Sequence, residues 1–127
     1  MEILNNALGI HEHALPLRNR RMQVIAENIA NADTPHFKAK DINFSKALDA
    51  ARSSPMRATQ SNHFEIGDLP GADGMMFRTP FNASADGNTV EMSVEQARYG
   101  KAAGDYQATL AFLENRISGI RKALRGE

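Results

Sequence analysis

Apolar residues recur at alternating steps of four and three along the first part of the chain. This spacing is that of a heptad seam, and it predicts an amphipathic helix within residues 1–31. Flanking apolar residues widen the face beyond one two-stranded seam, so we expect contact with more than one helix. Pro16 lies inside the pattern without a backbone donor, which predicts a kink or a break there. The seam positions are Leu4, Leu8, His11, Leu15, Arg18, Met22, Ile25 and Ile29.

The same alternation predicts a long helix within residues 89–127, and Gly126 is its expected stop. Beside the seam runs a strip of small residues that contains Gly100 and Gly104. Because glycine in a helix interior costs about 0.5–1 kcal/mol relative to alanine, the pair implies either a weak helix or close approach of another backbone. The seam comprises Met92, Gln96, Tyr99, Ala103, Tyr106, Leu110, Leu113, Ile117, Ile120 and Leu124, and the strip comprises Ala97, Gly100, Gly104, Ala108 and Ala111.

The segment between these helices, residues 32–88, is rich in proline and in turn signals such as Asp86-Gly87-Asn88. It predicts two helical turns over residues 44–51, extended chain elsewhere, and short strands near 62–66 and 75–79. It has too little patterned apolar surface for its own core, so its Phe residues are expected to dock on helices of this chain or a neighbour. We therefore predict one mainly α domain over 1–127, with terminal helices pairing as a coiled coil around a loop-rich middle.

Composition narrows the possible functions. The 127 residues carry no net charge and no Cys, which excludes disulfides and thiolate metal sites and argues against sequence-independent nucleic-acid binding. The N-terminus is acidic first and interrupted by Asn, so it fits a cleaved secretory signal poorly. No stretch approaches the roughly 20 apolar residues of a membrane span.

Candidate catalytic and metal-binding groups are weak. His11 and His13 are two apart, whereas the zinc-protease pattern needs two His four apart on one helix face, so His11 is interpreted as a partly buried seam residue. The scattered carboxylates Asp33, Asp41 and Asp49 are interpreted as turn and helix-cap residues. We predict no catalytic residues, no metal and no cofactor.

The most specific local signal is residues 25–35, Ile-Ala-Glu-Asn-Ile-Ala-Asn-Ala-Asp-Thr-Pro. Asn28 and Asn31 lie three apart on one helix face, where their amides can bond backbone groups at the helix end. By physical reasoning alone, the stretch predicts a well-defined helix terminus with a structural role.

That stretch also resembles the N-terminal signature of the flagellar rod, hook and hook-associated axial proteins. The likeness extends through ALPLRNRR at 14–21, IAENIANADTPHFKAKDINF at 25–44, residues 59–63, DGNTVEM at 86–92 and YQATLAFLENRISGIRKAL at 106–124. The last two blocks are similar to the proximal rod proteins of the family. Two departures are His36, where the family commonly has Gly, and Pro16, where it usually has an uninterrupted helix.

The resemblance implies a non-enzymatic building block of the bacterial flagellar basal body. Such proteins leave through the flagellar type III export apparatus without a cleaved signal. In the periplasm they self-assemble into a helical tube that surrounds the export channel and transmits torque. The implied partners are further copies of the chain, the FliE adaptor and the adjacent rod protein FlgC, with no nucleic acid and no small-molecule substrate.

Two other function classes stay open on the residues alone, a soluble coiled-coil adaptor or secretion chaperone and a small enzyme using His11, His13, His36 or His63. The rod interpretation is preferred, and it predicts that the apolar seams and the glycines form the assembly interface. The predicted interface residues are Leu4, Leu8, Leu15, Met22, Ile25, Asn28, Ile29, Asn31, Tyr99, Gly100, Gly104, Tyr106, Leu110, Leu113, Ile117, Ile120 and Leu124.

Overall fold

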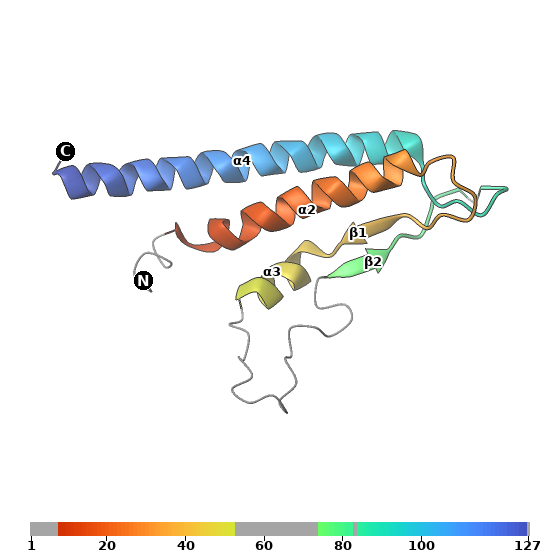
Figure 1. Cartoon of the computed structure of the whole chain (residues 1–127), viewed down its shortest axis with the longest axis horizontal. Helices are drawn as coiled ribbons and strands as arrows, with labels where there is room; N and C mark the ends of the chain where they lie inside the picture. Colours follow the sequence, from red (N-terminus) through yellow and green to blue (C-terminus); the bar gives the residue numbers. More distant parts are fainter. Residues whose placement is uncertain (1–7, 53–73, 83, 127) are drawn as a thin grey trace, which may run out of the picture.

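The computed structural model describes residues 8–52, 74–82 and 84–126. Two long helices lie side by side, and a short helix with a two-stranded antiparallel sheet packs on the other side of the first of them (Figure 1). The predicted mainly α architecture with a loop-rich middle is thereby confirmed. In chain order the elements are α2 (Ile10–Ala30), β1 (Lys40–Ile42), α3 (Phe44–Arg52), β2 (Met75–Phe77) and α4 (Met92–Arg125).

The two long helices run antiparallel in one constant register. Three contacts join them along their length: Asn28 with Glu95, Arg18 with Asp105, and the stacked rings of His11 and Phe112, whose centroids are 5.4 Å apart. The residue numbers of each pair add up to 123, so neither helix slips against the other over 17 residues, or roughly 25 Å.

The predicted seam of α4 has the right period but the wrong phase. Its buried residues are Glu95, Ala102 and Thr109, seven apart, and two of the three are polar. The predicted apolar seam lies to one side of this line, and several of its members stay exposed, among them Met92 and Tyr99. The register with α2 is therefore fixed by polar contacts rather than by the largest apolar side chains.

Pro16 does not break the first helix. Helix α2 is continuous from Ile10 to Ala30 with Pro16 inside it, and the register with α4 is the same at His11, before Pro16, as at Arg18, after it. The missing backbone donor is tolerated because Pro16 is exposed, where water can bond the carbonyl that loses its partner. Of the predicted kink or break, the break is wrong, and the kink stays a prediction.

The middle segment contributes three short elements. The predicted helix over 44–51 is confirmed as α3, and the strand near 75–79 as β2; the strand near 62–66 lies outside the described residues. Strand β1 was not predicted. Phe44 docks on α2, where the Arg18 guanidinium lies 4.4 Å from its ring centroid, whereas Phe77 and Phe81 remain 70% and 81% exposed.

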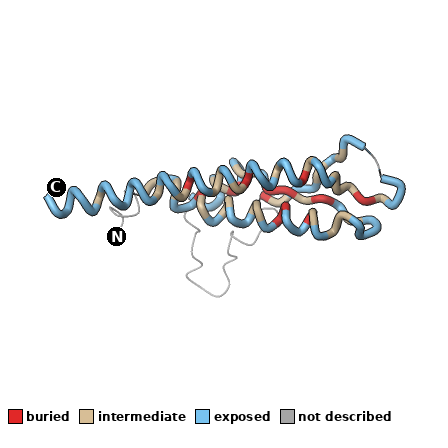
Figure 2. Tube along the Cα trace, turned by 90° about the horizontal axis from the view of Figure 1, so that it is seen from above, coloured by how far each residue is buried: buried red, intermediate tan, exposed pale blue. Residues whose placement is uncertain are grey.

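The core is small and lies where α2, β1 and α3 meet. Val24, Ile42 and Ala47 form its buried cluster, with Leu17 and Met75 packed against it. Of the seven buried apolar residues in the described ranges, four are alanines, and each alanine buries little surface. Figure 2 shows the buried positions in the half of the molecule where α2 and the strands overlap α4, while the C-terminal end of α4 is exposed up to its left-handed cap, Gly126.

Candidate functional site

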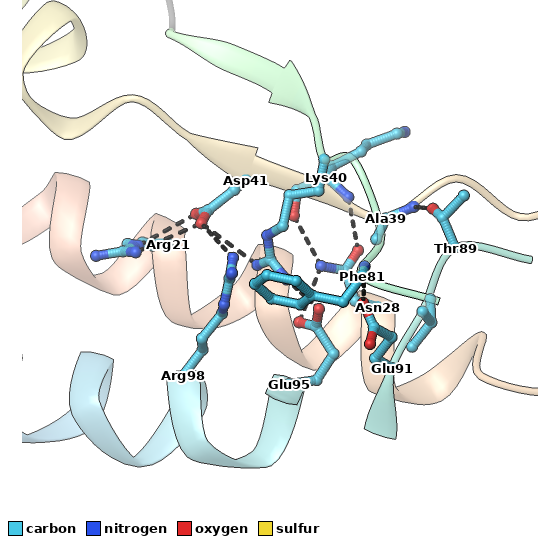
Figure 3. A network of polar contacts seen from close by, with 12 residues as sticks. Arg21, Asn28, Ala39, Lys40, Asp41, Phe81, Thr89, Glu91, Glu95 and Arg98 are labelled. Carbon is cyan, nitrogen blue, oxygen red and sulfur yellow. Dashed lines mark hydrogen bonds and ion pairs between the residues drawn. The ribbon is translucent and has the colours of Figure 1, made fainter. Parts of the chain in front are cut away.

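Asn28 connects three parts of the fold. Its side-chain Nδ2 donates to the Lys40 carbonyl at 2.7 Å and to Glu95 Oε2 at 3.2 Å, and its Oδ1 accepts from the Lys40 amide at 3.0 Å. The side-chain amide thus pairs with β1 as a neighbouring strand would, as Figure 3 shows. The predicted bonding at the helix end holds for Asn31, which donates to Glu27 O at 2.8 Å; Asn28 instead makes tertiary contacts.

Asp41 lies at the centre of a buried charge cluster, which corrects its interpretation as a turn or cap residue. Arg21 from α2 donates to its carboxylate through Nε at 3.1 Å and Nη2 at 3.4 Å. Arg78 and Arg98 place Nη2 and Nη1 at 3.3 and 3.7 Å from Oδ2. Arg78 also pairs with Glu95. Three guanidinium groups therefore face two carboxylates, and the cluster joins α2, β1, α4 and the residue after β2 (Figure 3).

The cluster sets the ionisation of Asp41. Burial by itself raises the pKa of this carboxyl. The hydrogen bonds from Arg21 and from the Ile42 amide, together with the charges of Arg21 and Arg78, outweigh that effect and hold the pKa below its ordinary value. Asp41 is thus a carboxylate in the folded chain, and it is the anion that the surrounding arginines require.

A second polar site joins the turn after α2 to the DGNT segment before α4. The Asn88 side chain is buried, and its Nδ2 lies 2.9, 2.9 and 2.8 Å from the carbonyls of Asn31, Ala32 and Thr34. An amide has only two N–H groups, so at least one is shared among the three carbonyls. Backbone bonds flank this clamp, from Thr89 N to Phe37 O at 3.0 Å and from His36 N to Asp86 O at 3.0 Å.

His36 adopts the left-handed conformation that usually favours glycine. Its φ is +61°, and among the described residues no other non-glycine residue has a positive φ. His36 therefore holds a backbone conformation that glycine adopts at lower cost, at the expense of backbone strain. Gly87 lies directly against it, since a Cβ there would meet His36 Nδ1 at 2.8 Å.

The predicted interface residues fall into three groups by exposure. Ile25 and Asn28 are buried inside the chain, and Leu4 lies outside the described residues. Those at the edge of the packed region are Leu8, Leu15, Met22, Ile29, Asn31, Tyr106, Leu110, Leu113 and Ile120. The exposed ones are Tyr99, Gly100, Gly104, Ile117 and Leu124. Ile25 and Asn28 therefore hold this chain together rather than lying at its surface.

The described residues also bear on the candidate chemistry. His11 is partly buried and stacks on Phe112, as predicted for a seam residue. Within residues 8–52, 74–82 and 84–126, no three His, Asp or Glu side chains gather closely enough to hold a metal ion. Over the same ranges, no helix is long and apolar enough to cross a membrane.

Sequence reasoning missed several residues of these two sites. Glu95 belongs neither to the predicted seam nor to the small-residue strip, yet it is 1% exposed and pairs with Arg78. Asn88 was only part of a turn signal. The available clue was that the Asn-rich stretch at 28–34 and the DGNTV block both carried the family resemblance, and the structure brings these two blocks into contact.

Comparison with known proteins agrees with this architecture. The family model described as "Flagella basal body rod protein" matches residues 8–38, the stretch of α2 and the clamped turn. The chain belongs to the family of flagellar basal body rod proteins, which are structural proteins and not enzymes.

The relatives carry one particular name within that class, Flagellar basal body rod protein FlgB. One from Cereibacter sphaeroides is 44% identical over 94% of each chain. One from Aeromonas hydrophila is 42% identical over 97% of this chain and 96% of its own. One from Escherichia coli K12 is 34% identical over 98% and 97%. The chain is thus similar to FlgB proteins over nearly its whole length, and it is a component of the flagellar basal body rod.

Proposed function

We propose that the chain is a structural subunit of the proximal rod that self-assembles into a helical tube surrounding the export channel and transmitting torque. The observation that carries this is the uncovered surface of α4. Helix α2 covers the line of Glu95, Ala102 and Thr109, while the neighbouring apolar stripe is covered only in part. Its exposed members include Met92 (41%), Tyr99 (38%), Ile117 (40%) and Leu124 (83%). Apolar stripes of this kind are usual at protein interfaces.

The small-residue strip supports the same proposal from another face of α4. Gly104 is nine residues after Glu95, which at 3.6 residues per turn places it about half a turn away from the α2 side. All five residues of the strip are exposed, and a Cβ at Gly100 or Gly104 would meet nothing within 4 Å. Such a flat face allows close approach by a neighbouring helix, and head-to-tail contacts of this type generate open helical assemblies.

We further propose that the chain is exported unfolded by the flagellar type III apparatus, without a cleaved signal, and assembles in the periplasm. The small core supports export in an unfolded state. In the part of the chain that the structure describes, four of the seven buried apolar side chains are alanine, so few large side chains there oppose unfolding. The proposed partners are other copies of the chain, the FliE adaptor and the rod protein FlgC. A cooperative melt of the isolated chain well above 60 °C would contradict this low stability, since ordinary mesophile domains melt at about 45–65 °C.

The test is to replace Gly104 by Leu. Apart from the neighbouring backbone of α4, no atom of the described residues lies within 4 Å of the added Cβ, and leucine is the better helix former by up to about 1 kcal/mol. The variant should therefore fold at least as well as the parent and still be exported. It should fail to restore motility or rods to a strain that lacks its own copy, because the side chain obstructs close helix approach.

Gly104→Ala is the matched control, because it brings the same gain in helix propensity with little bulk. Rods counted in purified basal bodies should be normal for this variant. Normal rods with Gly104→Leu would refute the role of this face in assembly. The alternative function, a soluble coiled-coil adaptor or secretion chaperone, predicts a small closed oligomer by light scattering that the Leu variant leaves intact.

A further inference from the structure

The register of β1 and β2 determines which of their residue pairs are hydrogen-bonded to each other. Lys40 faces Phe77, Asp41 faces Met76 and Ile42 faces Met75. Bonds from Asn43 N to Gly74 O at 2.8 Å and from Arg78 N to Ala39 O at 2.9 Å flank the ladder. In an antiparallel pair, hydrogen-bonded and non-hydrogen-bonded positions alternate. Lys40 and Phe77 are therefore a non-hydrogen-bonded pair, and their backbone N–H and C=O groups face away from each other.

The two edges of the ladder differ. On the β1 side, the outward groups of Lys40 are bonded by the Asn28 amide. On the β2 side, the N–H and C=O of Phe77 have no partner in the part of the chain that the structure describes. A strand edge with free donors and acceptors is a template for another extended chain. The backbone groups of Phe77 can therefore bond an extended segment, whereas the equivalent groups of Lys40 are already bonded by Asn28.

The side chains around this edge form a pocket of mixed character. Lys40, Met75, Met76 and Phe77 line a cavity of about 310 Å³. Phe77 is 70% and Met76 45% exposed, and the Lys40 ammonium has no acidic partner among the described residues. The pocket thus pairs apolar walls with one unneutralised positive charge, which complements a segment that carries a carboxylate beside an apolar side chain.

We propose that the outer edge of β2 is a docking site for an extended segment of a partner protein that has an acidic and an apolar side chain. The segment pairs with the Phe77 backbone, as in strand addition to an exposed sheet edge. Its apolar side chain enters the cavity, and its carboxylate faces Lys40. A helix does not fit, because its own backbone groups are already bonded. Pairing with β2 of a second copy does not meet this requirement, because β2 is Met-Met-Phe and offers no carboxylate to Lys40.

Peptide binding to the full-length, ¹⁵N-labelled chain tests the proposal. The probes are the pentapeptides Thr-Val-Glu-Val-Thr and Thr-Val-Lys-Val-Thr, both blocked at their ends. The Glu peptide should shift the Phe77 amide resonance and slow its hydrogen exchange, and it should bind at least about threefold tighter than the Lys peptide at low salt. No shift at Phe77 at millimolar peptide, or equal binding of the two peptides, would overturn the proposal.

Variants of Phe77 and Lys40 separate the contribution of the backbone hydrogen bond to peptide binding from that of the Lys40 charge. Phe77→Pro removes the outward N–H together with the phenyl ring but no ladder bond, because the ladder bonds belong to Met76. It should weaken the Glu peptide by about tenfold more than loss of the ring alone, as expected for one lost hydrogen bond. Phe77→Ala keeps that donor and should weaken it less. Lys40→Met should abolish the preference for Glu over Lys. A Pro variant that binds as well as the parent would overturn the strand pairing.

A measurement in the assembled basal body does not depend on the isolated chain being folded. A photo-crosslinking residue at position 77 should attach to a peptide that has Asp or Glu within two positions of the crosslink, identified by mass spectrometry. Attachment to a basic segment, or to β2 of a second copy, would overturn the proposal. This outcome is independent of the Gly104 test, because β2 and the glycine strip lie on different elements.

Discussion

The Asn28 side chain of α2 donates to Glu95 of α4 at 3.2 Å, across 67 positions of sequence and with each residue only 1% exposed. The same amide bonds both backbone groups of Lys40 in β1. One side chain thus joins the two terminal helices to strand β1, which lies between them in the sequence. The helices cannot separate without leaving this amide and a carboxylate unsatisfied.

Replacing Asn28 by Ala is expected to destabilise the folded chain by about 2–3 kcal/mol, because the Lys40 backbone groups and Glu95 lose their buried partner. Asn31→Ala is the matched control, three residues on, where the amide makes a solvent-exposed hydrogen bond to the last turn of its own helix; it should cost about 0.5 kcal/mol or less. Urea unfolding followed by far-UV circular dichroism measures both. Equal losses would show that Asn28 has no special tertiary role.

Asp41→Asn is expected to destabilise the chain by about 3 kcal/mol near neutral pH, because Arg21, Arg78 and Arg98 lose the carboxylate that they share. Of the three, only Arg78 keeps a carboxylate partner in this cluster, Glu95. The folded-state pKa of Asp41 is lowered. The ionised carboxylate therefore stabilises the fold above its unfolded-state pKa, and this contribution disappears as the pH falls through the folded-state pKa.

The difference between parent and variant should accordingly shrink as urea unfolding is repeated from about pH 7 down to about pH 3.5. Asp105→Asn is the control for a carboxylate that is partly exposed beside Arg18; it should cost less than about 1 kcal/mol. A difference for Asp41→Asn that stays constant over this pH range would contradict the assignment of a lowered pKa.

Asn88→Ala is expected to release the turn after α2, because three carbonyls lose the amide that lies between them. We expect a loss of about 2 kcal/mol and faster hydrogen exchange at the amides of Phe37 and Thr89, which bond nearby. Asn82→Ala changes an exposed asparagine of the same connecting segment and should leave both amides unchanged. Unaltered exchange in the Asn88 variant would rule out the clamp.

His36 gives a prediction with opposite signs for two replacements. Glycine relieves the strain of φ +61°, worth about 1–2 kcal/mol, but loses about 0.5–1 kcal/mol through its freer unfolded chain. His36→Gly should therefore raise stability by up to about 1 kcal/mol. His36→Val should lower it by at least about 1 kcal/mol, since β-branched residues tolerate this conformation poorly. Thermal melts of both variants provide the measurement; a valine variant as stable as the glycine one would contradict it.

Much of the local structure could be predicted from the chain. The 4-3 spacing gave both long helices, Gly126 gave the end of α4, and Phe44 began a short helix as expected. Strand β1 could not be predicted because two of its three residues, Lys40 and Asp41, are charged, whereas β2 is wholly apolar. It forms because Asn28 bonds one edge and β2 the other. Pro16 suggested a break that packing against α4 overrides.

The polar sites were hidden for a physical reason. Glu95, Asp41 and Arg78 are charged, and charged residues are ordinarily exposed, so a sequence pattern assigns them to the surface. They become buried because each finds its counter-ion on a different element, which no local window contains. The wrong face of α4 was predicted for the same reason. The apolar stripe was expected to contact α2, whereas the residues of α4 that contact α2 lie on a neighbouring face that carries Glu95 and Thr109.

The sequence by itself determined that the chain has two amphipathic helices, a turn-rich connection and the motifs of the flagellar rod family, because these depend on residue spacing along one chain. The tertiary structure decided which face of α4 meets α2, which asparagine holds β1, and which surfaces stay open for a neighbour. Those outcomes depend on long-range pairing of buried charges and amides, whose partners are set by the fold.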